Sequence, residues 1–150
     1  MSMHMIDVST KNETLPSAVG ECLVRMQHST LQLIRTGGIP KGDRVAVSQT
    51  AGVCFAAIIP VVWETLCHPL LPGSIDIVVD TSASEDGVSI RATVTGMGRT
   101  GFEMEALTAV SVAALNLYDM CKNVDRGMTI DGLRLVRKSG GRSGVYTADV

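Results

Sequence analysis

Residues 101–122 read GFEMEALTAVSVAALNLYDMCK, and their pattern decides the fold. Charged residues stand only at the two ends of this stretch, and residues 106–118 contain none. Apolar residues recur at helical spacing, and one stripe consists of Leu107, Val110, Ala114 and Leu117. The opposite side is apolar too, through Val112, Ala113 and Leu115. Because one sheet covers only one stripe, we expect a helix whose remaining apolar surface meets a second subunit.

The charged ends of this helix are too far apart to act on one small molecule within one subunit. Glu105 and Asp119 are fourteen positions apart, which is about 21 Å along a helix axis. Asp119 and Lys122 are three positions apart, so they share a face and can act together. A site that uses both ends therefore joins the acidic end of one helix to the Asp119 end of another subunit's helix. Alternatively, Glu103, Glu105 and Lys122 only complement the helix dipole, and spacing alone favours this alternative.

Composition and charge narrow the classes of function. A chain of 150 residues with 45% hydrophobic content is expected to form a single domain with its own core. Its formal net charge of −2 gives no general attraction to nucleic acid or to an anionic membrane, so we expect neither as a partner. Asp7, Lys11 and Glu13 interrupt the only candidate signal region, and no run is long enough to span a bilayer.

The cysteines indicate a reducing compartment. All four lie in apolar surroundings without CxxC spacing or a matching histidine pair: Cys22, Cys54, Cys67 and Cys121. Reduced, buried thiols are typical of cytosolic proteins, so we expect a cytoplasmic location and no metal site.

The order of predicted elements is that of an α+β domain. The strands are expected at residues 21–26, 74–80, 88–95 and 128–136. One helix is expected to begin with Ser29 as its N-cap and to end at Gly37, and a second to run from Asp43 to Pro60. With the helix at residues 101–122, this order predicts a ferredoxin-like sandwich, an antiparallel sheet with helices on one face. We expect the first dozen residues to form a flexible arm and the tail from Ser139 to be mobile.

Five segments carry a resemblance that covers nearly the whole chain. They are MIDVSTKNET, PKGDRVAVSQTAG, LCHPL at residues 66–70, GFEMEALTAVSVAALNLYDMCKNVDRGM and LVRKSGGRSG. In this order they resemble the molybdenum cofactor biosynthesis protein C family, the cyclic pyranopterin monophosphate synthases. The resemblance implies the same ferredoxin-like fold and a hexamer built as a trimer of dimers.

The resemblance also implies a reaction. A lyase of this family converts 3′,8-cyclo-7,8-dihydroguanosine 5′-triphosphate to cyclic pyranopterin monophosphate and diphosphate. Opening and closing rings and forming a cyclic phosphate needs proton transfers and phosphate binding, but no electron acceptor. We therefore expect no required cofactor, and Mg²⁺ accompanying the triphosphate is compatible with the reaction.

Residue roles follow from the matched positions. The implied catalytic residues are Asp119, Lys122 and Lys41. The implied substrate-binding residues are Leu66, Cys67, His68, Glu103, Met104 and Glu105. Lys138 and Arg142, in KSGGRSG, resemble a phosphate-gripping loop, although that segment by itself is only a flexible basic linker.

Three positions depart from the family pattern. Ile58 and Ile59 stand where a basic pair is usual, and Pro16 stands where an arginine is common. Each lost cation removes a charge-assisted hydrogen bond, worth about 1.5–3 kcal/mol, from the binding of a triphosphate. Other arginines compensate, or the pocket prefers a less charged ligand, or the chain is a catalytically diminished paralogue that binds a pterin or nucleotide. The sequence leaves these alternatives open.

Overall fold

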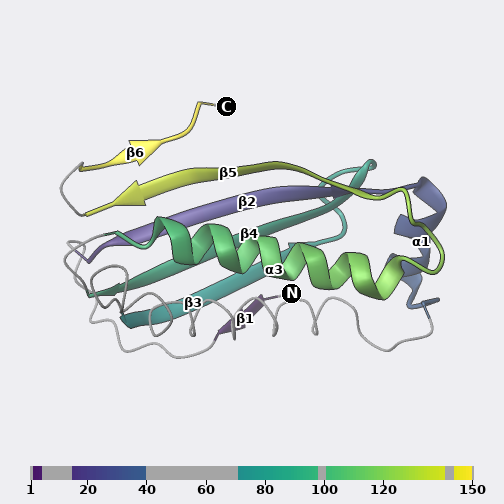
Figure 1. The fold of residues 1–150 in the computed structure, drawn as a ribbon, viewed down its shortest axis with the longest axis horizontal. Helices are drawn as coiled ribbons and strands as arrows, with labels where there is room; N and C mark the ends of the chain where they lie inside the picture. The colour runs from purple at the N-terminus through teal and green to yellow at the C-terminus, as the bar shows by residue number, and fades with distance from the viewer. Residues whose placement is uncertain (1, 5–14, 40–70, 98–100, 141–143, 150) are drawn as a thin grey trace.

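One antiparallel sheet dominates the computed structural model, which describes residues 2–4, 15–39, 71–97, 101–140 and 144–149. Its strands lie in the order β1-β3-β4-β2-β5-β6 (Figure 1). Their bounds are β1 Ser2–His4, β2 Ser17–Arg25, β3 Leu71–Asp80, β4 Gly87–Met97, β5 Thr129–Ser139 and β6 Tyr146–Thr147. The predicted α+β class with an antiparallel sheet is confirmed. The ferredoxin-like arrangement stays a prediction, because the expected helix from Asp43 to Pro60 lies outside the described residues.

Helix α3 (Glu103–Cys121) lies across one face of the sheet (Figure 1). Its buried stripe consists of Glu105, Ala106, Ala109, Val110, Ala113, Ala114, Leu117 and Cys121. Ala113 therefore faces the core, not the outer side where its spacing had placed it, and Leu107 is only half-buried. Leu115 is 59% exposed, so the outer side does present apolar surface.

Gly20 of β2 lets α3 approach the sheet closely. A Cβ atom at Gly20 would lie 3.2 Å from the carbonyl oxygen of Ala106, which is tighter than most such contacts. Around this contact the strands contribute a continuous apolar layer, with buried side chains that alternate along each strand: Ala18, Cys22, Val24, Ile75, Ile77, Val79, Val88, Ile90, Ala92 and Val94. This layer fixes α3, and therefore both of its charged ends, against the sheet.

The opposite face of the sheet carries charge. Glu21 of β2 accepts hydrogen bonds from Arg91 of β4 at 2.8 Å and from Arg134 of β5 at 2.9 Å. Burial by itself raises the pKa of Glu21, but the hydrogen bonds and charges of the two arginines outweigh it and leave the pKa below its ordinary value. One carboxylate thus links three neighbouring strands.

Helix α1 (His28–Thr36) begins two residues earlier than a cap at Ser29 would place it, so the expected cap is wrong. Its N-cap is Gln27, whose side chain makes no capping hydrogen bond. The carboxylate of Asp125 takes that role, because Oδ2 accepts from the Gln27 backbone N–H at 2.9 Å and from the Thr30 hydroxyl at 3.0 Å. The predicted end is confirmed, since Gly37 adopts a left-handed conformation with φ of 73°.

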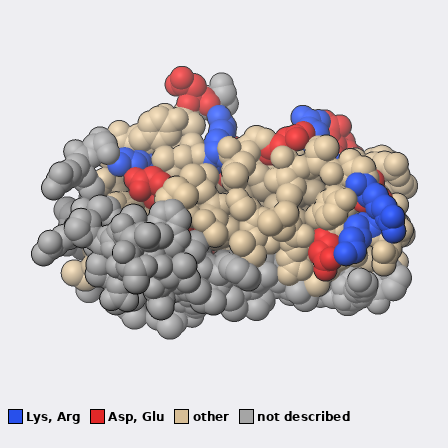
Figure 2. Space-filling model, in the orientation of Figure 1, with Lys and Arg blue, Asp and Glu red and all other residues tan. Residues whose placement is uncertain are grey.

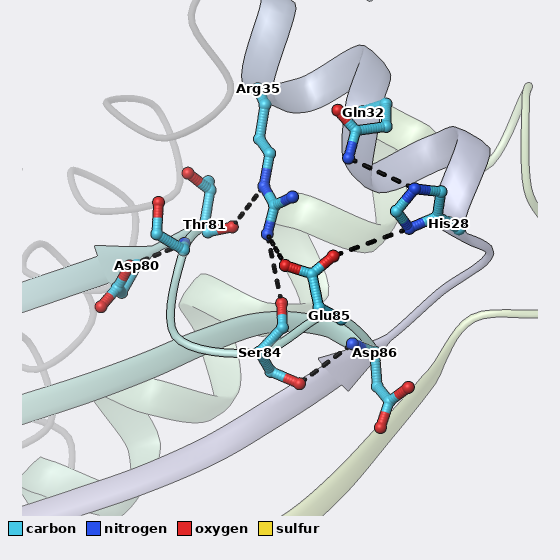
Figure 3. Close-up of polar contacts among 9 residues, drawn as sticks. His28, Gln32, Arg35, Asp80, Thr81, Ser84, Glu85 and Asp86 are labelled. Atoms are coloured by element: carbon cyan, nitrogen blue, oxygen red, sulfur yellow. Dashed lines mark hydrogen bonds and ion pairs between the residues drawn. The ribbon is translucent and has the colours of Figure 1, made fainter.

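Side chains of α1 also hold the turn between β3 and β4 (Figure 3). Arg35 donates to the carbonyl oxygen of Thr81 at 2.7 Å and to that of Ser84 at 3.3 Å. Glu85 lies between Arg35, at 3.4 Å, and His28, at 3.9 Å. This cluster anchors α1 at the end of the sheet away from the start of α3 (Figure 1).

Two short strands lie where the sequence predicted a flexible arm and a mobile tail. Ser2–His4 pairs with β3, and Tyr146–Thr147 pairs with β5. The four longer strands match the four predicted segments, but β2 ends one residue before the predicted 21–26 and β5 begins one residue after the predicted start at 128. Within the described residues, no helix is both long and apolar enough to cross a membrane.

Candidate active site

The N-terminal end of α3 brings together two charged residues that sequence reasoning assigned to substrate binding. Lys138 lies in β5, before the glycine-rich segment, and its Nζ is 3.1 Å from Oε1 of Glu103. The Lys138 side chain is 12% exposed and that of Glu103 is 29% exposed. An ion pair of this kind, shielded from water on most sides, fixes a cation at the end of the helix.

Glu105 lies two residues beyond Glu103, on the buried side of α3. It is 4% exposed, and its Oε2 atom has no hydrogen-bond partner among the residues that the structure describes. Burial raises the pKa of the Glu105 carboxyl above its ordinary value of 4.5, a hydrogen bond from its own backbone N–H opposes this, and the charge of Glu103 adds to it. A buried carboxyl with a raised pKa can hold a proton at a pH where exposed carboxylates have lost theirs. Met104, between these two, is exposed.

The C-terminal end of α3 carries the second predicted pair. Nζ of Lys122 donates to Oδ1 of Asp119 at 2.7 Å, across one turn of helix. Both side chains are exposed to solvent within the subunit. The predicted sharing of a face is therefore confirmed, and the pair presents a carboxylate and an ammonium side by side to any molecule that docks there.

The two ends stay apart within one subunit. Glu103 and Asp119 are sixteen positions apart on α3, so about 24 Å of helix separates them. Figure 2 shows uncharged surface over the middle of α3, with acidic and basic groups toward each end. One small substrate cannot touch both ends of the same helix.

The remaining predicted residues lie outside the described part of the chain. These are Lys41, Leu66, Cys67, His68 and Arg142. Of the three positions that depart from the family pattern, Pro16 is described, and it packs against Gly140, whose φ is 80°. Gly140 follows β5 directly, so position 16 lies at the same end of the sheet as Lys138 and Glu103. The missing arginine would therefore stand near this candidate site.

Gly101 is a further residue of the site that sequence reasoning missed. A Cβ atom there would lie 2.8 Å from Cδ and Oε2 of Glu103, and closer still to Oε1. The Glu103 carboxylate therefore folds back over Gly101. In the sequence, the one sign of this contact is that Gly101 stands two positions before the glutamate that begins the helix. Among the described residues, no cluster of His, Cys, Asp and Glu side chains is arranged to hold a metal ion.

Comparisons with known proteins agree with the residue pattern. The MoaC family model matches residues 5–141. A cyclic pyranopterin monophosphate synthase of Roseiflexus sp. (strain RS-1) is 50% identical over 146 residues, which are 97% of this chain and 92% of that protein. A protein of the same name from Roseiflexus castenholzii (strain DSM 13941 / HLO8) is 52% identical over 141 residues, which are 94% of this chain and 89% of that protein.

Proposed function

Because the chain belongs to the MoaC family, we propose that it is a cyclic pyranopterin monophosphate synthase of molybdenum cofactor biosynthesis. The observation that carries this proposal is identity of about one residue in two with two synthases along nearly their whole length. The substrate is the cyclised guanosine triphosphate, and the products are cyclic pyranopterin monophosphate and diphosphate. The reaction is a rearrangement with loss of diphosphate, so it requires no redox cofactor.

We assign the proton transfers to Asp119, Lys122 and Lys41. Nζ of Lys122 lies 2.7 Å from Oδ1 of Asp119, and this contact supports the assignment. The carboxylate can accept a proton from a bound ligand, and the neighbouring ammonium can donate one. Both side chains are exposed in the subunit, and so they are accessible to a substrate. Lys41, in the PKGD segment, is proposed as the second catalytic lysine.

The opposite end of α3 is proposed to bind the substrate. Lys138 supplies a cation for the phosphates, and Glu105 supplies a buried carboxyl for the polar edge of the ring system. Oε2 of Glu105, which has no partner within the described part of the chain, supports this role, because a buried polar atom without a partner costs about 1–3 kcal/mol unless a ligand satisfies it. The other residues proposed to bind substrate are Met104, Leu66, Cys67, His68 and Arg142, whereas Glu103 lies against Lys138.

The distance between the two ends leads to a shared site. About 24 Å of helix separates them, so we propose that Asp119 and Lys122 of one subunit meet Lys41 and the substrate-binding end of α3 of a neighbouring subunit. The assembly is proposed to be a hexamer, a trimer of dimers, with the apolar outer side of α3 at the dimer seam. Exposed Leu115 on that side supports this placement. We place the enzyme in the cytoplasm.

Turnover tests the function directly. Incubation of the protein with the cyclised guanosine triphosphate should release diphosphate and a pterin product. Asp119→Ala should lower kcat by at least about 100-fold, because a positioned acid or base contributes about 10²–10⁴. Asp86→Ala, which removes an exposed carboxylate from the β3–β4 turn, is the control and should retain activity.

One outcome would contradict the proposed function, and another would contradict the role of Asp119. Binding of a pterin without turnover by the unmodified protein would favour the diminished paralogue, for which the position of Pro16 beside Gly140 is the supporting observation. Full activity of a folded Asp119→Ala variant would remove Asp119 from the chemistry while leaving the synthase function in place.

A further inference from the structure

The ion pair between Glu103 and Lys138 differs from the other ion pairs in the described part of the chain. It joins the first residue of α3 to a residue near the end of β5. Every other ion pair there has at least one side chain that is 47% exposed or more, whereas these two are 29% and 12% exposed. Ion pairs at exposed sites contribute little, and shielded ones fix geometry more strongly. This pair is therefore suited to hold a side chain in place.

The backbone beside Glu103 is adapted to that geometry. Oε1 is the carboxylate atom that contacts Lys138, and it is also the atom closest to the missing Cβ of Gly101. Any larger residue at position 101 would push the carboxylate away from its present place. A glutamate that only complemented the helix dipole could point into solvent, and it would need neither Lys138 nor this glycine.

Lysine is a flexible anchor, and that flexibility has a cost. Its side chain loses rotamer entropy when it is fixed. An ammonium has three N–H donors, so it can contact a phosphate and Glu103 at the same time. A lysine already fixed by Glu103 can bind a phosphate without losing that entropy at the binding step.

We propose that Glu103 is a positioning residue that holds the Lys138 ammonium for the phosphates of the substrate, with Gly101 providing the space for its carboxylate. Glu103 itself makes no contact with substrate, in contrast to the role implied by the family resemblance. This inference rests on the proposed function of Lys138 as a phosphate contact.

A double-mutant cycle separates the two roles of Glu103. Glu103→Gln should raise KM by about tenfold with kcat changed less than about twofold, because a charge-assisted contact to Lys138 is lost. In a Lys138→Met background, the same substitution should change KM less than about twofold, since no ammonium remains to be positioned. Glu85→Gln, at the far end of the sheet, is the matched control and should leave KM unchanged.

Gly101→Ala tests the same contact without altering either charge. It should raise KM in the same direction as Glu103→Gln, and this effect should vanish in the Lys138→Met background. Gly127→Ala is its control, because the nearest atom to a Cβ there is 3.7 Å away. Thermal unfolding of each variant identifies any loss of folding, and titration with inorganic pyrophosphate gives the affinity without turnover.

The outcomes distinguish this inference from the proposed function. An effect of Glu103→Gln that persists undiminished in the Lys138→Met background would overturn it, because Glu103 would then act on the substrate directly. Unchanged pyrophosphate affinity and KM in Gly101→Ala would also overturn it. Wild-type KM in Lys138→Met would show that Lys138 is no phosphate contact, and an inactive wild-type protein would contradict the synthase function itself.

Discussion

Glu105 is the described residue whose environment departs most from what its side chain prefers. Its carboxyl is buried, one of its oxygens has no partner among the described residues, and burial raises its pKa. In the unfolded chain the same carboxyl titrates near its ordinary value of 4.5. Below that pH both states are protonated, and above it the folded state retains the proton longer. Folding is therefore progressively penalised as pH rises through the interval between the two values.

Glu105→Gln should remove this penalty. The free energy of unfolding of the variant, relative to that of the unmodified protein, is expected to increase as pH rises from 4.5 toward neutrality and then to level off. Urea unfolding at several pH values between 4 and 8, at one protein concentration, measures it. A constant difference across this range would mean that the pKa of Glu105 is the same in both states.

At the scale of elements, a single residue joins three parts of the chain. Asp125 follows α3, precedes β5 and caps α1, and its Oδ1 also accepts from the backbone N–H of Gly127 at 3.2 Å. Asp125 is buried beside the N-terminus of α1, whose donors it accepts from. Helix termini without such partners leave backbone N–H groups unpaired, so α1 depends on this distant carboxylate.

Asp125→Ala should lower the free energy of unfolding by about 1–3 kcal/mol, because two backbone N–H groups and a buried hydroxyl lose their acceptor. Asp125→Asn keeps one carbonyl oxygen as an acceptor, so its free energy of unfolding should fall by less than that of Asp125→Ala. Urea unfolding compares both with Asp86→Ala, which removes an exposed aspartate. Equal stability of Asp125→Ala and the unmodified protein would exclude a capping role.

The elements that sequence predicts well are those with a local signal. Alternation of apolar and polar residues predicted β3 and β4, and apolar residues at a spacing of 3.6, without charges between them, predicted α3. The cap of α1 could not be predicted, because its acceptor lies 95 residues from Thr30 and has no local pattern. For the same reason the partnership of Glu103 and Lys138 was missed, although family resemblance had pointed to both residues separately. Strands β1 and β6 are too short for periodicity to reveal them.

At the scale of the whole molecule, the site requires more than one subunit if both ends of α3 serve one reaction. An equal mixture of Asp119→Ala and Lys41→Ala chains, unfolded and refolded together, should recover about a quarter of wild-type activity. Half of the dimers would be mixed, and one of the two sites in each would receive both intact groups. Each variant refolded alone is the control and should stay inactive.

Absence of recovered turnover in mixtures whose subunits have exchanged would contradict the shared site. Sedimentation at micromolar concentration provides the independent measurement, because a monomer could not form such a site. A closed oligomer in which each variant alone remains fully active would remove Asp119 and Lys41 from the chemistry, and leave the assembly unaffected.

The ends of the strand order have a consequence for solubility. The sheet terminates in strands of three and two residues, and just inside them lie β3 with ten residues and β5 with eleven. A long strand with an unpaired edge is a template for intermolecular pairing and aggregation. Short outer strands offer few free N–H and C=O groups to another chain. The two terminal segments therefore withdraw residues 76–78 of β3 and residues 137–138 of β5 from pairing with further chains, a role that concerns the solubility of the enzyme and not its chemistry.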